Sequence, residues 1–141
     1  MVPQGILETV VYCSDLDAAR VFYEQVVGLQ IFSTEPGRHL FYKVGNSMLL
    51  VFNPQNTSTA KVEIDGQSIP LHGAKGACHV AFQSQYEQFD AIKANLKQHG
   101  VAIESEIDWP GGGHSIYCRD PAANSVEFAT RSLWFSEASD P

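Results

Sequence analysis

Hydrophobic and polar positions in the first half of the chain alternate as they do in a strand, then a helix, then three strands. Residues 6–13 are rich in β-branched and aromatic side chains, which is typical of a strand. Asp15 then supplies a helix N-cap, and apolar residues recur at spacings of three and four, as on one face of an amphipathic helix. Three further strands are predicted, at 29–34, 39–44 and 47–53. The Gly45-Asn46 turn predicts that the last two form a hairpin.

The same order of elements returns in the second half. A strand is predicted at 77–82, and a helix over 85–99 ends at Gly100. Three more strands are predicted, at 101–107, 115–119 and 125–130. An offset of 71 residues lays the first strand on the fifth, and an offset of 77 aligns the last strands, because the second half has the longer final turn.

The repeat predicts an α+β fold made of two βαβββ modules. The modules span residues 5–54 and 76–130, with a connector at 55–75 and a tail at 131–141. A half of this size buries its sheet poorly alone, so we expect one domain over 1–141 with a shared core. The polar, Pro- and Gly-containing connector fits a linker, a flap or a short extra strand. In the tail, apolar residues 133–135 are expected to pack on the domain or on a second subunit.

Composition and charge exclude several classes of protein. The chain has 9 Lys and Arg against 16 Asp and Glu, so its net charge is −7, which argues against nucleic acid and anionic membranes as partners. The longest apolar run, 48–52, is too short to span a bilayer. The first residues lack the basic and apolar regions of a secretory signal, and the 3 cysteines form no C-x-x-C motif. We therefore expect a reduced, cytoplasmic protein.

Three stretches, in this order and with this spacing, resemble the vicinal oxygen chelate superfamily. This superfamily includes glyoxalase I, fosfomycin-resistance enzymes, extradiol dioxygenases and bleomycin-resistance proteins. The stretches are the D-L…F-Y…G-L helix at 15–29, His-Val-Ala-Phe at 79–82 and the hairpin Ser-Ile-Tyr-Cys-Arg-Asp-Pro-Ala-Ala-Asn-Ser-Val-Glu at 115–127. Ala123 stands where the family usually has Gly, so we expect a slightly different backbone there, since Ala disfavours positive φ.

The resemblance implies a divalent metal in a trough formed by the curled sheets. In the family, the metal ligands come from the first and last strand of each module. The resemblance places Glu8, Leu50, His79 and Glu127 at these positions here. His79 and Glu127 match the commonest family residues, Glu8 stands where His or Gln is usual, and Leu50 has no ligand atom. The first His of the extradiol dioxygenases is thus replaced by Glu8, which weakens that interpretation.

The chemistry of these residues supports a metal-ligand role independently of the resemblance. Glu127 lies between apolar Val126 and Phe128, and a carboxylate facing a core is costly unless it is paired or bound to a metal. One imidazole and two carboxylates balance a divalent ion and leave positions open for substrate. The candidate ions are Mn, Mg, Fe, Ni, Co and Zn, one per site. The alternative is that Glu8 is solvent-exposed and that His79 and Glu127 bond to each other without a metal.

Several other residues have both a functional and a purely structural interpretation. Tyr117 is predicted to donate to a substrate oxygen, or to fill the trough as an aromatic. His114 follows three glycines and is a candidate general acid or base, or an exposed loop histidine. Arg38 and His39 either hold an anionic substrate or form a solvated strand end. Glu8 is a candidate proton carrier if it is not a ligand.

These inferences favour a metal-dependent enzyme. Its small substrate would chelate the ion through neighbouring oxygens, and glyoxalase-like isomerase or lyase chemistry is the preferred reaction. The alternative is a metal-free small-molecule binder like the bleomycin-resistance proteins, which Leu50 and Glu8 favour. A degenerate interaction module is a third possibility. The resemblance also implies a homodimer.

Overall fold

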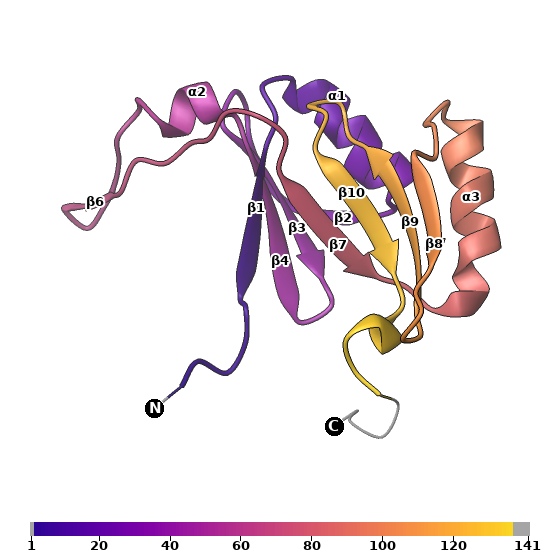
Figure 1. Ribbon diagram of the computed structural model, residues 1–141. Coiled ribbons are helices and arrows are strands. Elements are labelled where there is room, and N and C mark those ends of the chain that lie inside the picture. Colours follow the sequence, from indigo (N-terminus) through magenta and orange to yellow (C-terminus); the bar gives the residue numbers. More distant parts are fainter. Residues whose placement is uncertain (1, 137–141) are drawn as a thin grey trace. The chain divides into compact units, whose positions relative to one another are not determined.

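The computed structural model describes residues 2–136 and divides the chain into two units. One unit reaches to Cys78 and the other starts at His79. Each unit contains a four-stranded mixed sheet with a parallel pair at one edge. Figure 1 shows the strands of each sheet with their helices.

The first unit has the predicted strand–helix–strand order. Its elements are β1 (Glu8–Tyr12), α1 (Leu16–Val21), β2 (Gln30–Glu35), β3 (His39–Val44) and β4 (Ser47–Phe52). The sheet order is β1-β4-β3-β2, in which β1 runs parallel to β4 and the other pairs are antiparallel. The β3–β4 hairpin turns at Gly45 and Asn46, as predicted.

The predicted helix of this unit begins as an α-helix and continues as a π-helix. Asp15 caps α1 by accepting a hydrogen bond from the Ala18 backbone N–H at 3.0 Å. After Val21 the chain continues as the π-helical segment Phe22–Val26, which apolar spacing alone did not predict. This segment buries Tyr23, whose ring lies 6.1 Å from that of Tyr42 on β3.

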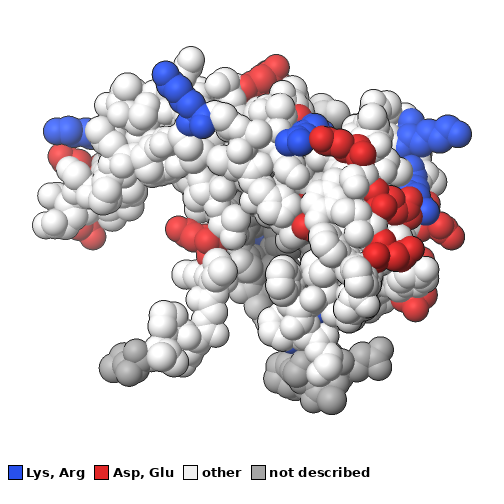
Figure 2. All heavy atoms as spheres, viewed as in Figure 1, with Lys and Arg blue, Asp and Glu red and all other residues white. Residues whose placement is uncertain are grey.

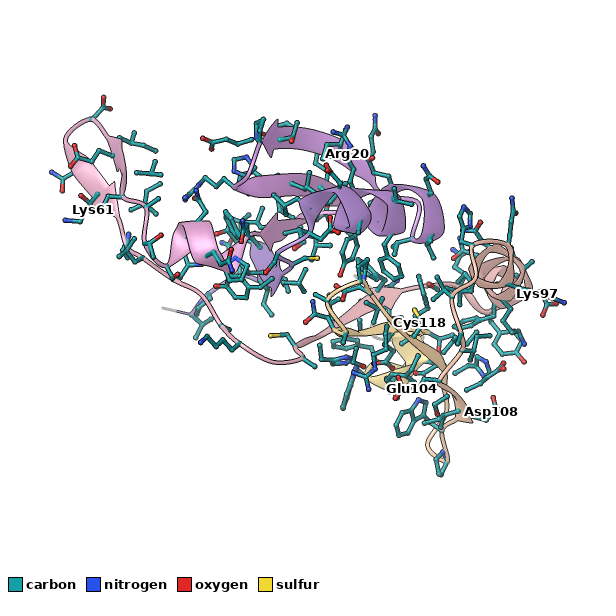
Figure 3. The ribbon with its side chains drawn as sticks, turned by 90° about the horizontal axis from the view of Figure 1, so that it is seen from above. Arg20, Lys61, Lys97, Glu104, Asp108 and Cys118 are labelled. Atoms are coloured by element: carbon teal, nitrogen blue, oxygen red, sulfur yellow. The ribbon has the colours of Figure 1, made fainter. Side chains whose placement is uncertain are left out.

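The connector contains short elements of its own. They are α2 (Pro54–Thr57), β5 (Val62–Ile64) and β6 (Gln67–Ile69). β5 and β6 pair only with each other, as an antiparallel hairpin that projects from the sheet of the first unit (Figures 1 and 3, where Lys61 marks it). The short-strand interpretation of the connector is therefore the one observed.

The second unit repeats the first. Its elements are β7 (His79–Gln83), the 3-10 turn Tyr86–Gln88, α3 (Phe89–Gln98), β8 (Ser105–Asp108), β9 (His114–Arg119), β10 (Ser125–Ala129) and the 3-10 turn Arg131–Leu133. The sheet order is β7-β10-β9-β8, with β7 parallel to β10. The strand predicted from 101 begins only at Ser105. One reason is that the Val101 N–H closes the helix end by bonding to the Leu96 carbonyl.

Strand registers confirm the internal repeat. Glu8 pairs with Met48, forty residues on, and His79 pairs with Ser125, forty-six residues on. The difference of six equals the difference between the two sequence offsets of 71 and 77. Equivalent positions in the two units therefore occupy equivalent places in their sheets.

The turn between β9 and β10 corrects one expectation. Ala123 has a φ of 63°, so the backbone is left-handed here despite the absence of Gly. Asp120 supports the turn: its Oδ1 accepts from the backbone N–H groups of Ala122 and Asn124, and its carbonyl accepts from Ala123. These bonds hold a conformation that costs an L-residue about 1–2 kcal/mol.

Replacing Ala123 by Gly is therefore expected to stabilise the protein. The strain energy removed from the folded state exceeds the free-energy cost of making the unfolded chain more flexible. The free energy of unfolding should therefore rise by about 0.5–1 kcal/mol, and Tm by roughly 2–4 °C. Thermal unfolding followed by circular dichroism measures it. Ala122→Gly is the matched control, because Ala122 has no positive φ and should lose stability. An Ala123→Gly protein that melts no higher than the parent contradicts the argument.

The surface of the second unit carries much of the negative charge. In Figure 2 acidic side chains gather around α3 and β8, where Glu104, Glu106 and Asp108 are exposed. Arg119 and Lys93 partly neutralise them through bonds of 2.6 Å to Glu104 and 2.9 Å to Glu106. Among residues 2–136, the helices are all too short or too polar to cross a bilayer.

Candidate functional site

One face of the second sheet carries a polar cluster centred on Glu127. Tyr117 lies directly opposite Glu127 in the β9–β10 ladder, and Ser125 lies opposite His79 in the β7–β10 ladder. Since alternate residues of a strand share a face, Ser115, Tyr117, Glu127 and His79 all project to one side. The opposite face carries buried core side chains, among them Val126 and Phe128.

His79 has a fixed ring orientation. Its Nδ1 lies 3.0 Å from the Ser125 carbonyl oxygen, which only accepts, so Nδ1 carries a hydrogen. Its Nε2 lies 3.2 Å from Oε2 of Glu127. In the neutral ring both of these atoms present lone pairs, so the contact becomes attractive when a proton or a cation joins them.

Glu127 accepts a hydrogen bond from Ser115 and faces His79, although it is almost fully buried, with 4% of its surface exposed. Ser115 donates its hydroxyl to Oε1 at 2.6 Å, and the indole N–H of Trp109 donates to Ser115 Oγ at 2.9 Å. The Tyr117 side chain lies directly opposite Glu127 in the β9–β10 ladder. Burial of a carboxylate is costly without such partners, which explains how this acid occupies a core strand.

Tyr117 is a proton donor rather than a base at neutral pH. Burial raises the pKa of its phenol, and the hydrogen bond and negative charge of Glu127 raise this pKa further, while Ser115 lowers it. The ring stacks near that of His79, with centroids 6.2 Å apart. Tyr117 is thus an aromatic that packs beside His79 and lies opposite Glu127, and donation to a substrate oxygen stays a prediction.

The donor chemistry of this pair fits a divalent cation. Nε2 of His79 and Oε2 of Glu127 are adjacent, and the opposite ring nitrogen bonds a backbone carbonyl, as is usual for a metal-bound His. Within the described part of the second unit, the structure brings no third His, Cys, Asp or Glu to this pair.

His114 lies away from this cluster. It begins β9 instead of lying in the glycine loop, and it is buried with 7% exposure. Because it neighbours Ser115 in the strand, its ring projects to the helix-covered face, where it meets Phe89 at 4.7 Å. Its Nδ1 and Nε2 lie 2.7 Å from Asp108 and 3.0 Å from Glu106. The structure therefore does not bring this candidate acid or base to Glu127.

The first unit places different chemistry at the equivalent positions. Glu8 is exposed at the start of β1, and Leu50 is buried opposite Val10 and Phe41. Phe41 thus takes the place of Tyr117 in the other unit. The polar cluster has no counterpart on this sheet.

The equivalent face of the first sheet carries an aromatic cluster instead. The rings of His39 and Phe41 stack at 3.7 Å, and Phe52 meets Phe41 edge-on at 5.4 Å. His72 of the connector covers Phe52 at 4.9 Å and bonds the Tyr12 hydroxyl through Nδ1 at 2.6 Å. We call Tyr12, His39, Phe41, Phe52 and His72 the aromatic cluster. Burial lowers the pKa of His39, which outweighs the opposing effect of Glu35.

Arg38 borders the aromatic cluster. Its guanidinium lies 5.7 Å from the centre of the Phe52 ring and donates to Asn56 at 2.8 Å. It is buried, with 9% exposure, so it is not the solvated strand end that was one interpretation of the sequence.

Ser115 and Trp109 were missed from the sequence. Strand alternation was sufficient to find Ser115, because it lies two residues from Tyr117 and therefore on the same face. The same alternation separates His114 from Glu127. Trp109 gave no local signal, because its contact with Ser115 depends on how the glycine loop folds back.

Comparison with known families and structures agrees with the fold. The model of the Glyoxalase/Bleomycin resistance protein/Dioxygenase superfamily matches residues 5–128, which include both four-stranded sheets except Ala129, the last residue of β10. The crystal structure of lactoylglutathione lyase from Agrobacterium tumefaciens is 41% identical, with a TM-score of 0.87. That similarity covers 96% of this chain and 100% of the other.

More distant structures share the fold alone. A fosfomycin resistance protein from Listeria monocytogenes is 17% identical with a TM-score of 0.67, and covers 90% of this chain and 91% of its own. A glyoxalase/bleomycin resistance protein/dioxygenase from Nocardioides is 20% identical with a TM-score of 0.69, and covers 100% of this chain and 89% of its own. The predicted fold class is confirmed.

Proposed function

The chain belongs to the Glyoxalase/Bleomycin resistance protein/Dioxygenase superfamily, and on that premise we propose that it is a divalent-metal-dependent lyase of the glyoxalase type. The proposal rests on one observation above all: Nε2 of His79 faces the buried Oε2 of Glu127 at 3.2 Å. The 41% identity to a lactoylglutathione lyase supports the reaction class. The substrate proposed is a small molecule with neighbouring oxygens, and lactoylglutathione is the first compound to test.

The residues of the cluster have distinct tasks in this proposal. His79 and Glu127 hold the ion, which supplies Lewis-acid stabilisation of negative charge on substrate oxygen. Tyr117 keeps its hydroxyl proton at neutral pH and is placed to donate it to a substrate oxygen. Glu8 is proposed as a third ligand or as the proton carrier.

Metal analysis tests the proposal. Protein purified without chelator, then reloaded with Mn, Fe, Ni, Co or Zn, is expected to bind about one ion per chain, because a carboxylate and an imidazole already face each other. His79→Ala should lose the ion. Turnover is measured as metal-dependent release of thiol from lactoylglutathione, with the carbonyl product trapped by a hydrazine so that an unfavourable equilibrium does not conceal it.

Two controls sharpen this test. Glu8→Ala separates the two tasks of Glu8, because Ala has no ligand atom: loss of the ion indicates a ligand, whereas a retained ion with reduced turnover indicates a proton carrier. His99→Ala is the matched His control, because His99 ends α3 and bonds Asn95. A wild-type chain that refuses every ion tested would contradict the proposal.

A second candidate function is metal-free binding of a planar molecule. The aromatic cluster favours it, because stacked and edge-on rings offer faces to an aromatic ligand. Phe41→Leu should weaken such binding and leave metal affinity unchanged, measured by fluorescence quenching with a planar probe such as bleomycin. Cytoplasmic location and a homodimer stay predictions, the latter checked by light scattering.

A further inference from the structure

Building on the proposed metal function, we infer that Trp109 and Ser115 position Glu127 so that only its Oε2 faces the cation beside His79. We call the chain of hydrogen bonds Trp109–Ser115–Glu127 the relay. The bond between Ser115 and Glu127 is shielded from solvent, since Ser115 is fully buried and Glu127 nearly so.

The hydrogen-bond chemistry gives the relay a single direction. An indole N–H only donates, so Ser115 Oγ must accept from Trp109 at 2.9 Å. An ionised carboxylate only accepts, so the Ser115 hydroxyl hydrogen points to Oε1 of Glu127 at 2.6 Å. Each member thus orients the next one.

This direction determines which carboxylate oxygen is offered. Oε1 already receives a short charge-assisted bond from Ser115, while Oε2 faces Nε2 of His79 at 3.2 Å. Rotation of the carboxylate to present both oxygens breaks the bond from Ser115. Glu127 is therefore set to bind as a one-oxygen ligand.

The glycine loop supplies the fixed end of the relay. Trp109 and Gly113 close the loop, with the Trp109 N–H donating to the Gly113 carbonyl at 3.0 Å, and Gly112 donates back to Trp109 at 3.0 Å. Gly113 lies against the backbone of Leu133, where a Cβ would approach its nitrogen to 2.9 Å. The loop is thus tightly turned, and it presents the indole from a fixed position.

Variants of the relay test the inference through metal affinity, measured by calorimetry with Zn and Co. Ser115→Ala is expected to weaken binding by about 10–100-fold, the usual effect of losing a supporting hydrogen bond. Trp109→Phe keeps the ring and removes the donor, so a smaller, several-fold loss is expected. Ser115→Thr keeps the hydroxyl and should restore affinity. Trp134→Phe is the matched tryptophan control and should change nothing, since Trp134 is 81% exposed.

A second readout needs no metal. The chain has only 2 tryptophans, so Trp134 supplies an internal reference in nitrogen–proton NMR spectra. The indole signal of Trp109 is expected to move on Ser115→Ala and on Glu127→Gln, while that of Trp134 stays. The ring signals of His79 should also move on Ser115→Ala, because Oε2 leaves its fixed position.

These readouts separate the inference from the proposed function. If the wild type binds metal and both Ser115→Ala and Trp109→Phe bind equally well, the inference is overturned. A purely structural role would lower Tm without changing the affinity of the folded protein, which also overturns it. If the wild type binds no ion, the proposed function fails, and the metal-free spectra decide: movement of the His79 signals on Ser115→Ala supports the positioning, and unchanged signals reject it.

Discussion

Replacing Glu127 by Gln is expected to weaken divalent-metal binding by more than the ~100-fold that loss of a supporting hydrogen bond can cost, with the fold retained. The change removes the negative charge and the Oε2 lone pairs that face His79. The fold survives because Gln has nearly the same volume, its amide oxygen still accepts from Ser115, and its amide N–H reaches His79 Nε2. Calorimetric titration with Zn or Co and a thermal melt measure the two effects.

Glu104→Gln is the matched control for this prediction. Glu104 lies in the same unit but is exposed and bonded to Arg119, whose hydrogen bonds hold the pKa of this carboxyl below its usual range. Its loss should leave metal affinity unchanged. Equal affinity of Glu127→Gln and the wild type would remove Glu127 from the metal site and with it the proposed function.

Replacing Gly113 by Ala is expected to destabilise the protein by about 3 kcal/mol, which corresponds to a fall in Tm of roughly 10 °C. Two costs add. The φ of 101° strains any L-residue, and the new Cβ lies 2.9 Å from the nitrogen and 3.0 Å from the Cα of Leu133. Both close atoms belong to backbone, so no side-chain rotation relieves the overlap.

The neighbouring glycines separate these two costs. Gly112 has the same φ of 101° but open space around its Cβ position, so Gly112→Ala should show the strain alone, about 1–2 kcal/mol. Gly111 has neither a positive φ nor a close neighbour, so Gly111→Ala should be nearly neutral. Urea or thermal unfolding ranks the three variants. The argument fails if Gly113→Ala is no less stable than Gly112→Ala.

Local sequence patterns predicted most of the fold because strands and short helices are marked by side-chain periodicity. The Asp15 cap and the Gly45-Asn46 hairpin follow from neighbouring residues, and the repeat follows from comparing the two halves of the chain. The start of β8 did not, because Leu96 binds the Val101 N–H across the helix end. The conformation of Ala123 did not either, because Asp120 holds the turn through hydrogen bonds that outweigh the preference of Ala.

The candidate site also has features that the sequence predicted and features that only the structure showed. The pairing of His79 with Glu127 followed from the repeat and the family resemblance, and the structure places the two side chains in contact. His114 is separated from His79 and Glu127 because side chains alternate along β9, which puts His114 and Ser115 on opposite faces of the sheet. The relay was beyond local reasoning, since Trp109 reaches Ser115 through a loop that Leu133 confines.

By itself the sequence determined the two-module architecture, the acidic surface and the identity of the acid and imidazole, since periodicity, charge and residue chemistry are local properties. Only the tertiary structure decided which oxygen of Glu127 faces His79, and that aromatic rings take the place of the polar cluster in the first unit. Those features depend on hydrogen bonds and ring contacts between residues far apart in the chain, whose direction is fixed only when the strands are in register.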